Sequence, residues 1–157
     1  MINHSKELEK LIESLEYTPK LLLHSCCAPC SSYVLSYLSD YFKITVLYYN
    51  PNISPLEEYE KRKKEQIRLI SKMKFKNKVD ILEIDYDNDK FIDITRGLEA
   101  LEEGRERCFK CYKLRLEKTA LIGKKHNYDF FGTTLSVSPY KNSQKINEIG
   151  FQLEKEY

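Results

Sequence analysis

Residues 20–38 read KLLLHSCCAPCSSYVLSYL, and this stretch decides the fold. An apolar run over residues 20–25 stops at Cys26. The segment 31–38 then carries apolar side chains at helical spacing, at Tyr33, Val34, Tyr37 and Leu38. The pattern predicts a strand, a loop that carries cysteines, and a helix in immediate succession.

The rest of the chain continues this alternation. Further strands are expected over 44–49, 79–84 and 128–135, and further helices over 55–73, 91–101 and 111–126. The turn Asn50-Pro51-Asn52 ends the second strand, Ser54 is the expected cap of the next helix and Pro55 its first residue. Because sequential parallel strands need long connections, the pattern predicts an α/β domain with a parallel sheet between two layers of helices.

Composition limits the class of protein. A chain of 157 residues with 41% hydrophobic content can bury one core, so a single domain over residues 1–157 is expected. The formal charge of +2 is too small to indicate nucleic-acid binding by itself. No apolar run has the length of a membrane span, and the start does not resemble a signal peptide. We therefore expect a cytoplasmic protein with no membrane partner.

All five cysteines fall into two clusters. Cys26, Cys27 and Cys30 follow the first strand, and Cys108 and Cys111 lie far downstream. Reducing conditions in the cytoplasm make structural disulfides a poor explanation for them. Loops at the carboxyl ends of parallel strands line the ligand crevice of an α/β sheet, so we expect both clusters to share one pocket there. An all-thiolate pocket suits an iron-sulfur cluster.

Two alternatives stay open on spacing alone. The pairs Cys27/Cys30 and Cys108/Cys111 have the spacing of a structural zinc site, which would make the chain a zinc-stabilised, non-catalytic RNA-binding module. Cys27-Ala28-Pro29-Cys30 at a helix start is also typical of a thioredoxin-like dithiol oxidoreductase. The dithiol hypothesis leaves the second pair without a role. A shared pocket uses every cysteine, and we prefer it for that reason.

Four ordered motifs carry a resemblance to a known family. They are LHSCCAPCS at 23–31, YNPNI at 49–53 with Glu58, Tyr59 and Arg62 behind it, RCFKCY at 107–112 with Arg115 and Leu116, and FGTTL at 131–135 followed by SPYK at 138–141. Together they resemble the QueH family of epoxyqueuosine reductases. The resemblance implies a two-electron reduction of epoxyqueuosine to queuosine at the wobble position of tRNA. It also implies iron-sulfur chemistry without cobalamin, with tRNA and an unidentified electron donor as partners.

Carried over to this sequence, the resemblance implies a ligand set. Cys26, Cys27, Cys108 and Cys111 match the metal-binding cysteines of the family, and Cys30 is a further metal ligand or a catalytic residue. A 4Fe-4S cluster is expected, with room for an additional iron.

The resemblance also implies a fold similar to the PP-loop domains, the adenine nucleotide alpha-hydrolase-like group of Rossmann-type folds. Pro29 stands where such enzymes place phosphate-binding backbone donors, so no use of ATP is expected. The sequence ends at Tyr157, before the Cys-Gly-Cys segment of longer members, so a shortened family member is expected.

Further residues are candidates for substrate contacts. Tyr49 is the expected proton donor or stacking platform, although packing in the core is the plainer explanation. The remaining candidates for substrate binding are Asn50, Asn52, Arg105, Arg107, Thr133, Thr134 and Lys141. Glu58 and Arg62 belong either to the pocket wall or to an ordinary helical ion pair. The lysines and arginines of 61–78 would meet tRNA phosphates or simply face water, and Arg105, Arg107 and Lys110 are the better candidates for tRNA.

Overall fold

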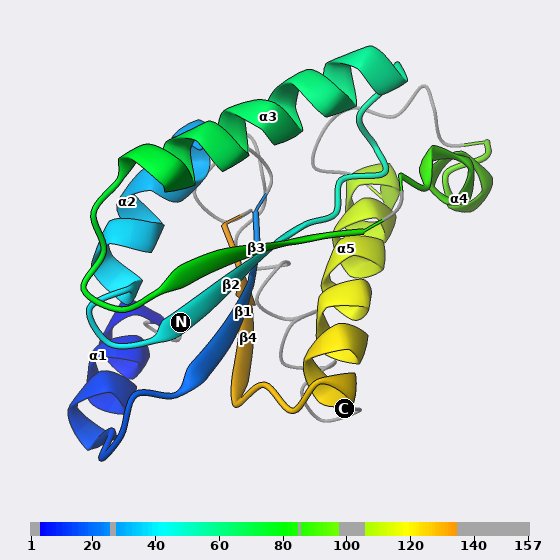
Figure 1. Cartoon of the computed structure of the whole chain (residues 1–157). Helices are drawn as coiled ribbons and strands as arrows, with labels where there is room; N and C mark the ends of the chain where they lie inside the picture. Colours follow the sequence, from blue (N-terminus) through cyan, green and yellow to red (C-terminus); the bar gives the residue numbers. More distant parts are fainter. Residues whose placement is uncertain (1–3, 26–27, 85, 98–105, 135–157) are drawn as a thin grey trace.

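The computed structural model describes residues 4–25, 28–84, 86–97 and 106–134, and it shows a sheet between helical layers (Figure 1). The strands are β1 (Lys20–His24), β2 (Lys43–Tyr48), β3 (Val79–Glu83) and β4 (Phe130–Thr133). The helices are α1 (His4–Ser14), α2 (Ala28–Leu38), α3 (Leu56–Lys72), α4 (Asn88–Ile94) and α5 (Glu106–Lys125). The four described strands run parallel in the order β3-β2-β1-β4. The predicted α/β fold class is confirmed.

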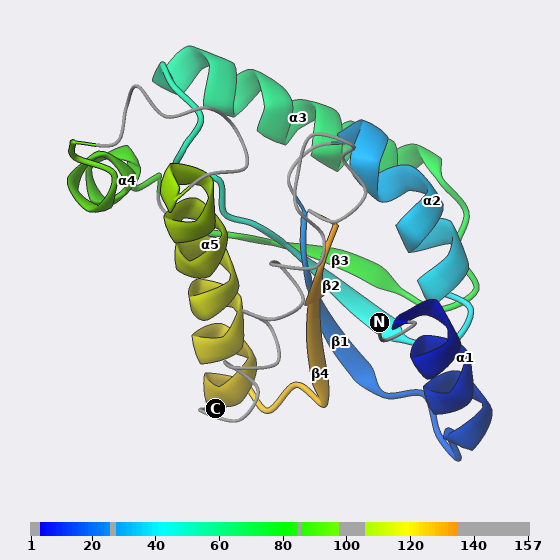
Figure 2. The ribbon, with the colours of Figure 1, turned by 180° about the vertical axis from the view of Figure 1, so that it is seen from behind.

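Alternating side chains of β1 and β2 build two apolar layers. Leu21 and Leu23 join Ile44 and Val46 in one cluster, which packs against α2 and the neighbouring helices. The intervening residues Leu22 and Leu47 face the opposite side, where the partly buried Leu114 and Ile122 of α5 cover them. Strand side chains point alternately to the two faces, so a strand buried on both faces is apolar at nearly every position. Figure 2 shows α2 and α3 on one side of the sheet and α5 on the other.

The strand order places the functional edge of the sheet. From β1 the chain adds β2 and then β3 on one side, and α5 later leads back to β4 on the other side of β1. The carboxyl ends of β1 and β4 therefore flank the point where the strand order reverses, which is where open α/β sheets bind ligands. β1 ends at this edge with His24, and Cys26 and Cys27 follow soon after it in the sequence.

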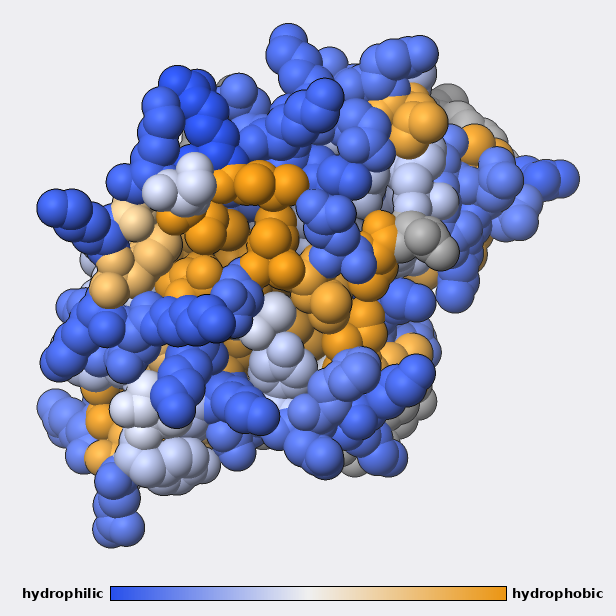
Figure 3. Space-filling model, in the orientation of Figure 1, coloured by the Kyte–Doolittle hydropathy of each residue, from blue (hydrophilic) through white to orange (hydrophobic). Residues whose placement is uncertain are grey.

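β3 is the outermost described strand on one side of the sheet, and its residues are partly buried or exposed. Figure 3 shows hydrophobic surface across the middle of the view, where Figure 1 draws β3 in front of the sheet.

Several predicted boundaries need correction. Pro55, not Ser54, occupies the cap position of α3, and it makes no side-chain cap hydrogen bond. The helix expected over 91–101 runs instead from Asn88 to Ile94, and part of that expected range lies outside the described residues. The helix that carries the second cysteine pair begins at Glu106, earlier than expected, and α1 was not predicted. Tyr33, expected on the apolar helix face, is 77% exposed, whereas Leu35, which was not expected there, is buried in the core with Leu38.

Candidate active site at the carboxyl edge of the sheet

A buried hydrogen-bond chain joins the two segments that carry cysteines. The amide of Asn50, just after β2, donates to the backbone carbonyl of Ser25, 2.9 Å away. Arg115 of α5 donates from Nη1 to the Asn50 side-chain oxygen at 3.1 Å. Ser25 directly precedes Cys26, and Arg115 lies one helical turn after Cys111 on the same face of α5. The loop after β1 and the start of α5 are therefore held to one another through Asn50.

Gln66 of α3 fixes both flanks of the first cysteine cluster. Ser25 Oγ donates to Gln66 Oε1 at 2.6 Å, and Gln66 Nε2 donates to Ser31 Oγ at 3.0 Å. All three residues are fully buried. Buried polar groups are costly unless they are hydrogen-bonded, so this network favours one conformation of the backbone at residues 25 and 31.

His24 holds the ends of three strands together. Its Nε2 lies 2.8 Å from the carbonyl oxygen of Tyr49, and because a carbonyl only accepts, Nε2 donates in this bond. Its Nδ1 lies 3.0 Å from the hydroxyl of Thr133 at the end of β4. The His24 side chain is itself fully buried.

Arg115 is a buried cation without an anionic partner in the described part of the chain. Its side chain is 3% exposed, and Nε has no hydrogen-bond partner there. Among the described residues, the guanidinium donates a hydrogen bond to the neutral amide of Asn50. A buried guanidinium is strongly destabilising unless a negative charge lies close by. This position beside Cys111 is therefore suited to an anionic group.

Tyr49 and Cys111 lie close enough to act on one another. Both side chains are buried, at 2% and 6% exposure. Burial raises the pKa of the Tyr49 phenol to about 12, with smaller contributions from the negative charges of Asp87 and Cys111. The phenol therefore stays protonated at neutral pH and remains a hydrogen-bond donor. Tyr48 points to the other face, where it packs against Tyr59.

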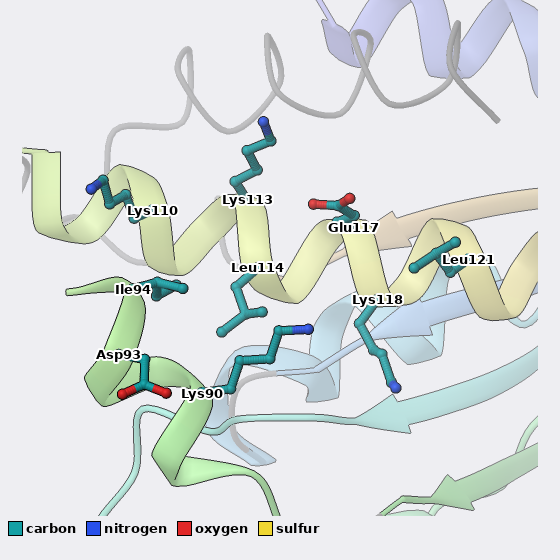
Figure 4. Close-up of a pocket in the computed structure, with 9 residues that line it drawn as sticks. All are labelled: Lys90, Asp93, Ile94, Lys110, Lys113, Leu114, Glu117, Lys118 and Leu121. Atoms are coloured by element: carbon teal, nitrogen blue, oxygen red, sulfur yellow. The ribbon is translucent and has the colours of Figure 1, made fainter. Parts of the chain in front are cut away.

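A basic groove lies beside this end of α5. It has a volume of about 590 Å³ and separates α4 from α5. Figure 4 shows Lys90 of α4 reaching toward Leu114, while Lys113 leaves the other side of α5. Four lysines outnumber two carboxylates among the lining residues, which are Lys90, Asp93, Ile94, Lys110, Lys113, Leu114, Glu117, Lys118 and Leu121. We call this the α4/α5 groove.

The structure describes part of the predicted site. Tyr49, Asn50, Cys111, Thr133 and Thr134 all lie at the carboxyl edge of the sheet or beside it. Cys30 lies in the first turn of α2 and Cys108 in the first turn of α5, but their side chains lie outside the described part. The same holds for the side chain of Arg107, and Cys26, Cys27, Arg105 and Lys141 lie wholly outside the described residues.

The metal-ligand prediction stays a prediction. Within the described residues no three His, Cys, Asp or Glu side chains gather into a metal site, and of the expected ligands only the Cys111 side chain is described. Cys111 is free of any disulfide. The predicted ligand set is therefore tested by experiment below.

Other predicted residues have structural roles. Glu58 and Arg62 form an exposed ion pair, with 2.8 Å between Oε1 and Nε. They therefore form the ordinary helical ion pair that was the alternative to a place in the pocket wall. On the same helix Glu60 and Glu65 pair with Lys63 and Arg68, so α3 resembles a solvated helix face more than a tRNA surface. Asn52 is partly buried, and its Oδ1 has no hydrogen-bond partner among the described residues.

Sequence reasoning missed Gln66, Asp87 and Lys118 as site residues. Each is a single polar residue within a helix or next to one, and no spacing in the sequence marks it. Arg115 was part of a recognised motif but had no predicted role.

Comparison with known proteins identifies the family. The model of the family described as epoxyqueuosine reductase QueH matches residues 21–157. The chain belongs to the QueH family. Curated relatives named epoxyqueuosine reductase QueH include those of Staphylococcus epidermidis, 41% identical over 99% of this chain, and Streptococcus pyogenes serotype M1, 40% identical over 97%. A relative from Acinetobacter baylyi is 37% identical over 88% of the chain.

The chain spans only part of the length of these QueH relatives. It covers 68% of the Staphylococcus epidermidis protein, 60% of the Streptococcus pyogenes protein and 62% of the Acinetobacter baylyi protein. None of the described helices is long and apolar enough to span a bilayer.

The raised pKa of Tyr49 predicts a pH-dependent stability difference. Between pH 10 and about 12 the phenol ionises in the unfolded chain but stays neutral in the folded one. Ionisation then favours the unfolded state, so the stability of the native chain should fall relative to Tyr49→Phe as pH rises above 10. The fall is at most about 1.4 kcal/mol per pH unit. Urea unfolding of both proteins at pH 8 and pH 11 measures it, and an unchanged difference would contradict the buried, protonated phenol.

Proposed function

We propose that this chain is an epoxyqueuosine reductase, which converts epoxyqueuosine to queuosine at the wobble position of tRNA with an iron-sulfur cluster. The observation that carries the proposal is the family match over residues 21–157, which includes both cysteine clusters. The activity belongs to the proposal because the chain spans 60–68% of the length of its first two relatives. Membership of the family favours this reaction over the zinc-module and dithiol alternatives.

The chemistry of the donor set fits the expected cluster. Cys26, Cys27, Cys108 and Cys111 would hold a 4Fe-4S cluster, and Cys30 would serve an additional iron or the reaction itself. A cluster with four thiolate ligands carries net negative charge. The buried guanidinium of Arg115, one turn from Cys111, would supply the opposite charge that the described residues do not. The buried cation and the proposed thiolate ligands would therefore compensate for one another's charge.

The reaction needs electrons, acid and a dry site. Removing the epoxide oxygen consumes two electrons and two protons and releases one water molecule. When bound, the cluster supplies electrons and a Lewis-acidic iron. Tyr49 remains protonated beside Cys111 and is the candidate proton donor. Asn50, Arg115 and His24 hold the surrounding backbone in place and are themselves buried away from water.

The basic α4/α5 groove supports the proposal that the chain binds tRNA. Three of its lysines lie on α5, the helix that carries Cys111, and the fourth lies on α4, on the opposite wall of the groove. Lysines that neutralise phosphates release counterions and give binding a steep salt dependence. On α3, in contrast, described carboxylates pair with some of the cations. We therefore assign the phosphate contacts to the groove.

The direct test is turnover on modified tRNA. The protein is reconstituted with iron and sulfide without oxygen, supplied with a strong reductant and incubated with tRNA that carries epoxyqueuosine. We expect a broad absorption band near about 400 nm, typical of thiolate-bound iron-sulfur clusters. We also expect nucleosides that have lost one oxygen by mass analysis.

Cysteine variants separate the alternatives. Cys27→Ser and Cys111→Ser should both lose iron and activity, because both belong to one proposed ligand set. A protein that takes up one colourless zinc and no iron would support the zinc module. If Cys27→Ser lost activity while Cys111→Ser stayed fully active, the result would support the alternative of a dithiol oxidoreductase. Unchanged tRNA with a full cluster and a strong reductant would overturn the reductase proposal.

Arg115 gives a prediction with two readouts. In the metal-free protein, Arg115→Met removes a buried charge that has no described anionic partner, so the free energy of unfolding should stay the same or rise. In the loaded protein the same change removes a cation near the cluster. The reduction potential should then become more negative, because the reduced cluster carries one more negative charge.

Urea unfolding of the metal-free protein and a potentiometric titration of the loaded protein measure these effects. Lys113→Met is the matched control, since it removes a positive charge from an exposed position on the same helix. Strong destabilisation of the metal-free protein by Arg115→Met, with no change in potential, would show that Arg115 acts through packing alone.

The groove predicts how salt affects tRNA binding. Lys90→Gln and Lys113→Gln should weaken tRNA binding at low salt, and each should lower the slope of log K against log salt by about 1. Lys61→Gln and Lys64→Gln on the exposed face of α3 remove the same charge and should change neither quantity. Fluorescence anisotropy of labelled tRNA over a salt series measures the slopes. Equal effects of the two pairs would contradict the assignment.

A further inference from the structure

A second hollow lies at the carboxyl edge of the sheet, distinct from the α4/α5 groove. It has a volume of about 410 Å³ and is lined by Tyr49, Ile84, Tyr86, Asp87 and Lys118. Tyr49 follows β2, while Ile84 and Asp87 lie just beyond β3. The volume falls within the range of sites that bind small ligands, and the edge of the sheet is where such sites form. We call this the Asp87 hollow.

Asp87 directs a charge into this hollow. It occupies the cap position of α4 but makes no cap hydrogen bond with its side chain. In the described part of the chain its carboxylate accepts no hydrogen bond and forms no ion pair within 4.0 Å. Asp87 and Tyr49 both line the hollow, and the negative charge of Asp87 contributes to the raised pKa of the Tyr49 phenol. Two acceptor oxygens are therefore available on the wall of the hollow.

Lys118 adds a donor to the same hollow. Its Nζ lies 5.8 Å from the centre of the Tyr49 ring, a cation-π arrangement. Figure 4 shows Lys118 leaving the same side of α5 as Leu114. Lys118 forms no ion pair with any carboxylate among the described residues. An ammonium donor and a carboxylate acceptor thus line one hollow without neutralising each other directly.

Aromatic rings complete the walls. The Tyr86 hydroxyl donates a hydrogen bond to the carbonyl of Ile53. The centre of the Tyr86 ring lies 4.5 Å from the centre of the Tyr59 ring. These contacts hold the Tyr86 side chain in place. Flat rings with two χ angles bind planar ligands at low cost in conformational entropy. The hollow therefore suits a planar heteroaromatic ring with hydrogen-bonding groups on its edge.

The polar groups select one kind of nucleobase. A guanine-type base presents two neighbouring donors, N1–H and the 2-amino group, which match a carboxylate, and next to them the acceptor O6, which matches an ammonium. Adenine places the acceptor N1 where the carboxylate lies, and cytosine and uracil lack two adjacent donors. Among the common bases, only the guanine type satisfies both Asp87 and Lys118.

We infer that the Asp87 hollow binds the guanine-type base of the nucleotide that undergoes reduction, with Asp87 as the residue that reads its edge. The inference rests on the proposed function, since the epoxyqueuosine base is a 7-deazaguanine and keeps this edge. Lys118 of the hollow lies about two helical turns after Cys111 on α5, so a base in the hollow would lie beside the helix that carries Cys111. Bases splayed from an RNA loop are commonly recognised by stacking and edge contacts of this kind.

Binding measurements test the inference without turnover. Two anticodon stem-loop RNAs are compared, one with guanine and one with inosine at the wobble position, because inosine lacks only the 2-amino group. Anaerobically reconstituted protein is titrated into labelled RNA without reductant, and anisotropy gives Kd. The native chain should bind the guanine RNA about tenfold more tightly, the effect of one lost charge-assisted hydrogen bond. In Asp87→Asn this preference should vanish.

Two further variants keep the test decisive. Asp80→Asn removes the same charge from an exposed position on β3 and should retain the preference. Lys118→Met should weaken the binding of both RNAs by the same factor, since both retain O6. It should therefore leave the preference for guanine over inosine intact. Thermal unfolding verifies that each variant is folded.

The outcomes distinguish this inference from the proposed function. A guanine preference that persists in folded Asp87→Asn, or that is absent from the native chain, overturns the base assignment, whether or not the native protein reduces epoxyqueuosine tRNA. Absence of reduction by the native protein overturns the proposed function, whatever the RNA preference. Loss of the preference in Asp87→Asn alone supports the assignment.

Discussion

The buried contact between Arg115 and Asn50 is the constraint on which the candidate site depends. Through Asn50 it joins α5 to the backbone carbonyl of Ser25, and so joins two cysteine segments that are distant in the chain. A buried guanidinium is destabilising unless its surroundings compensate for lost hydration. A neutral amide compensates for only part of this cost. In the described part of the chain no anionic partner supplies the rest, and the thiolate-bound cluster that we propose beside Cys111 would do so.

Polar side chains replace apolar ones near the cysteines. Farther from this edge, Leu22, Ile44 and Val46 pack as ordinary apolar layers. At the edge, Gln66 bridges Ser25 and Ser31, and His24 bridges the strand ends. A fully bonded polar network is more directional than apolar packing, so it specifies the backbone more narrowly. This distribution suits the proposal that the cysteines of the two clusters bind one group.

The charges beside the site divide into two surfaces with different chemistry. The α4/α5 groove is mainly basic and open, which suits phosphates. Among the described residues, the Asp87 hollow has one carboxylate and one ammonium on its wall together with two tyrosine rings, which suits a base. Lys118 lines both, so the two surfaces lie next to one another along α5. A nucleotide could place its backbone and its base on these two surfaces at once.

The sequence by itself determined the alternation of strands and helices, the parallel sheet and the position of the cysteines after β1. These follow from local periodicity and from the length of the connections, which are properties of neighbouring residues. The motifs were also sufficient to identify the family. Boundaries such as the start of α5 or the cap of α3 were less predictable, because capping contacts and tertiary packing decide them.

Only the tertiary structure decided which polar residues belong to the site. Gln66, Arg115 and Asp87 come from three separate segments, and each acquires its role from a partner that is remote in sequence. Burial, which makes the charge of Arg115 costly and raises the pKa of Tyr49, arises when α5 packs onto the sheet. No local pattern encodes that packing, because hydrogen bonding and desolvation depend on the distance between side chains in the fold rather than on their spacing along the chain.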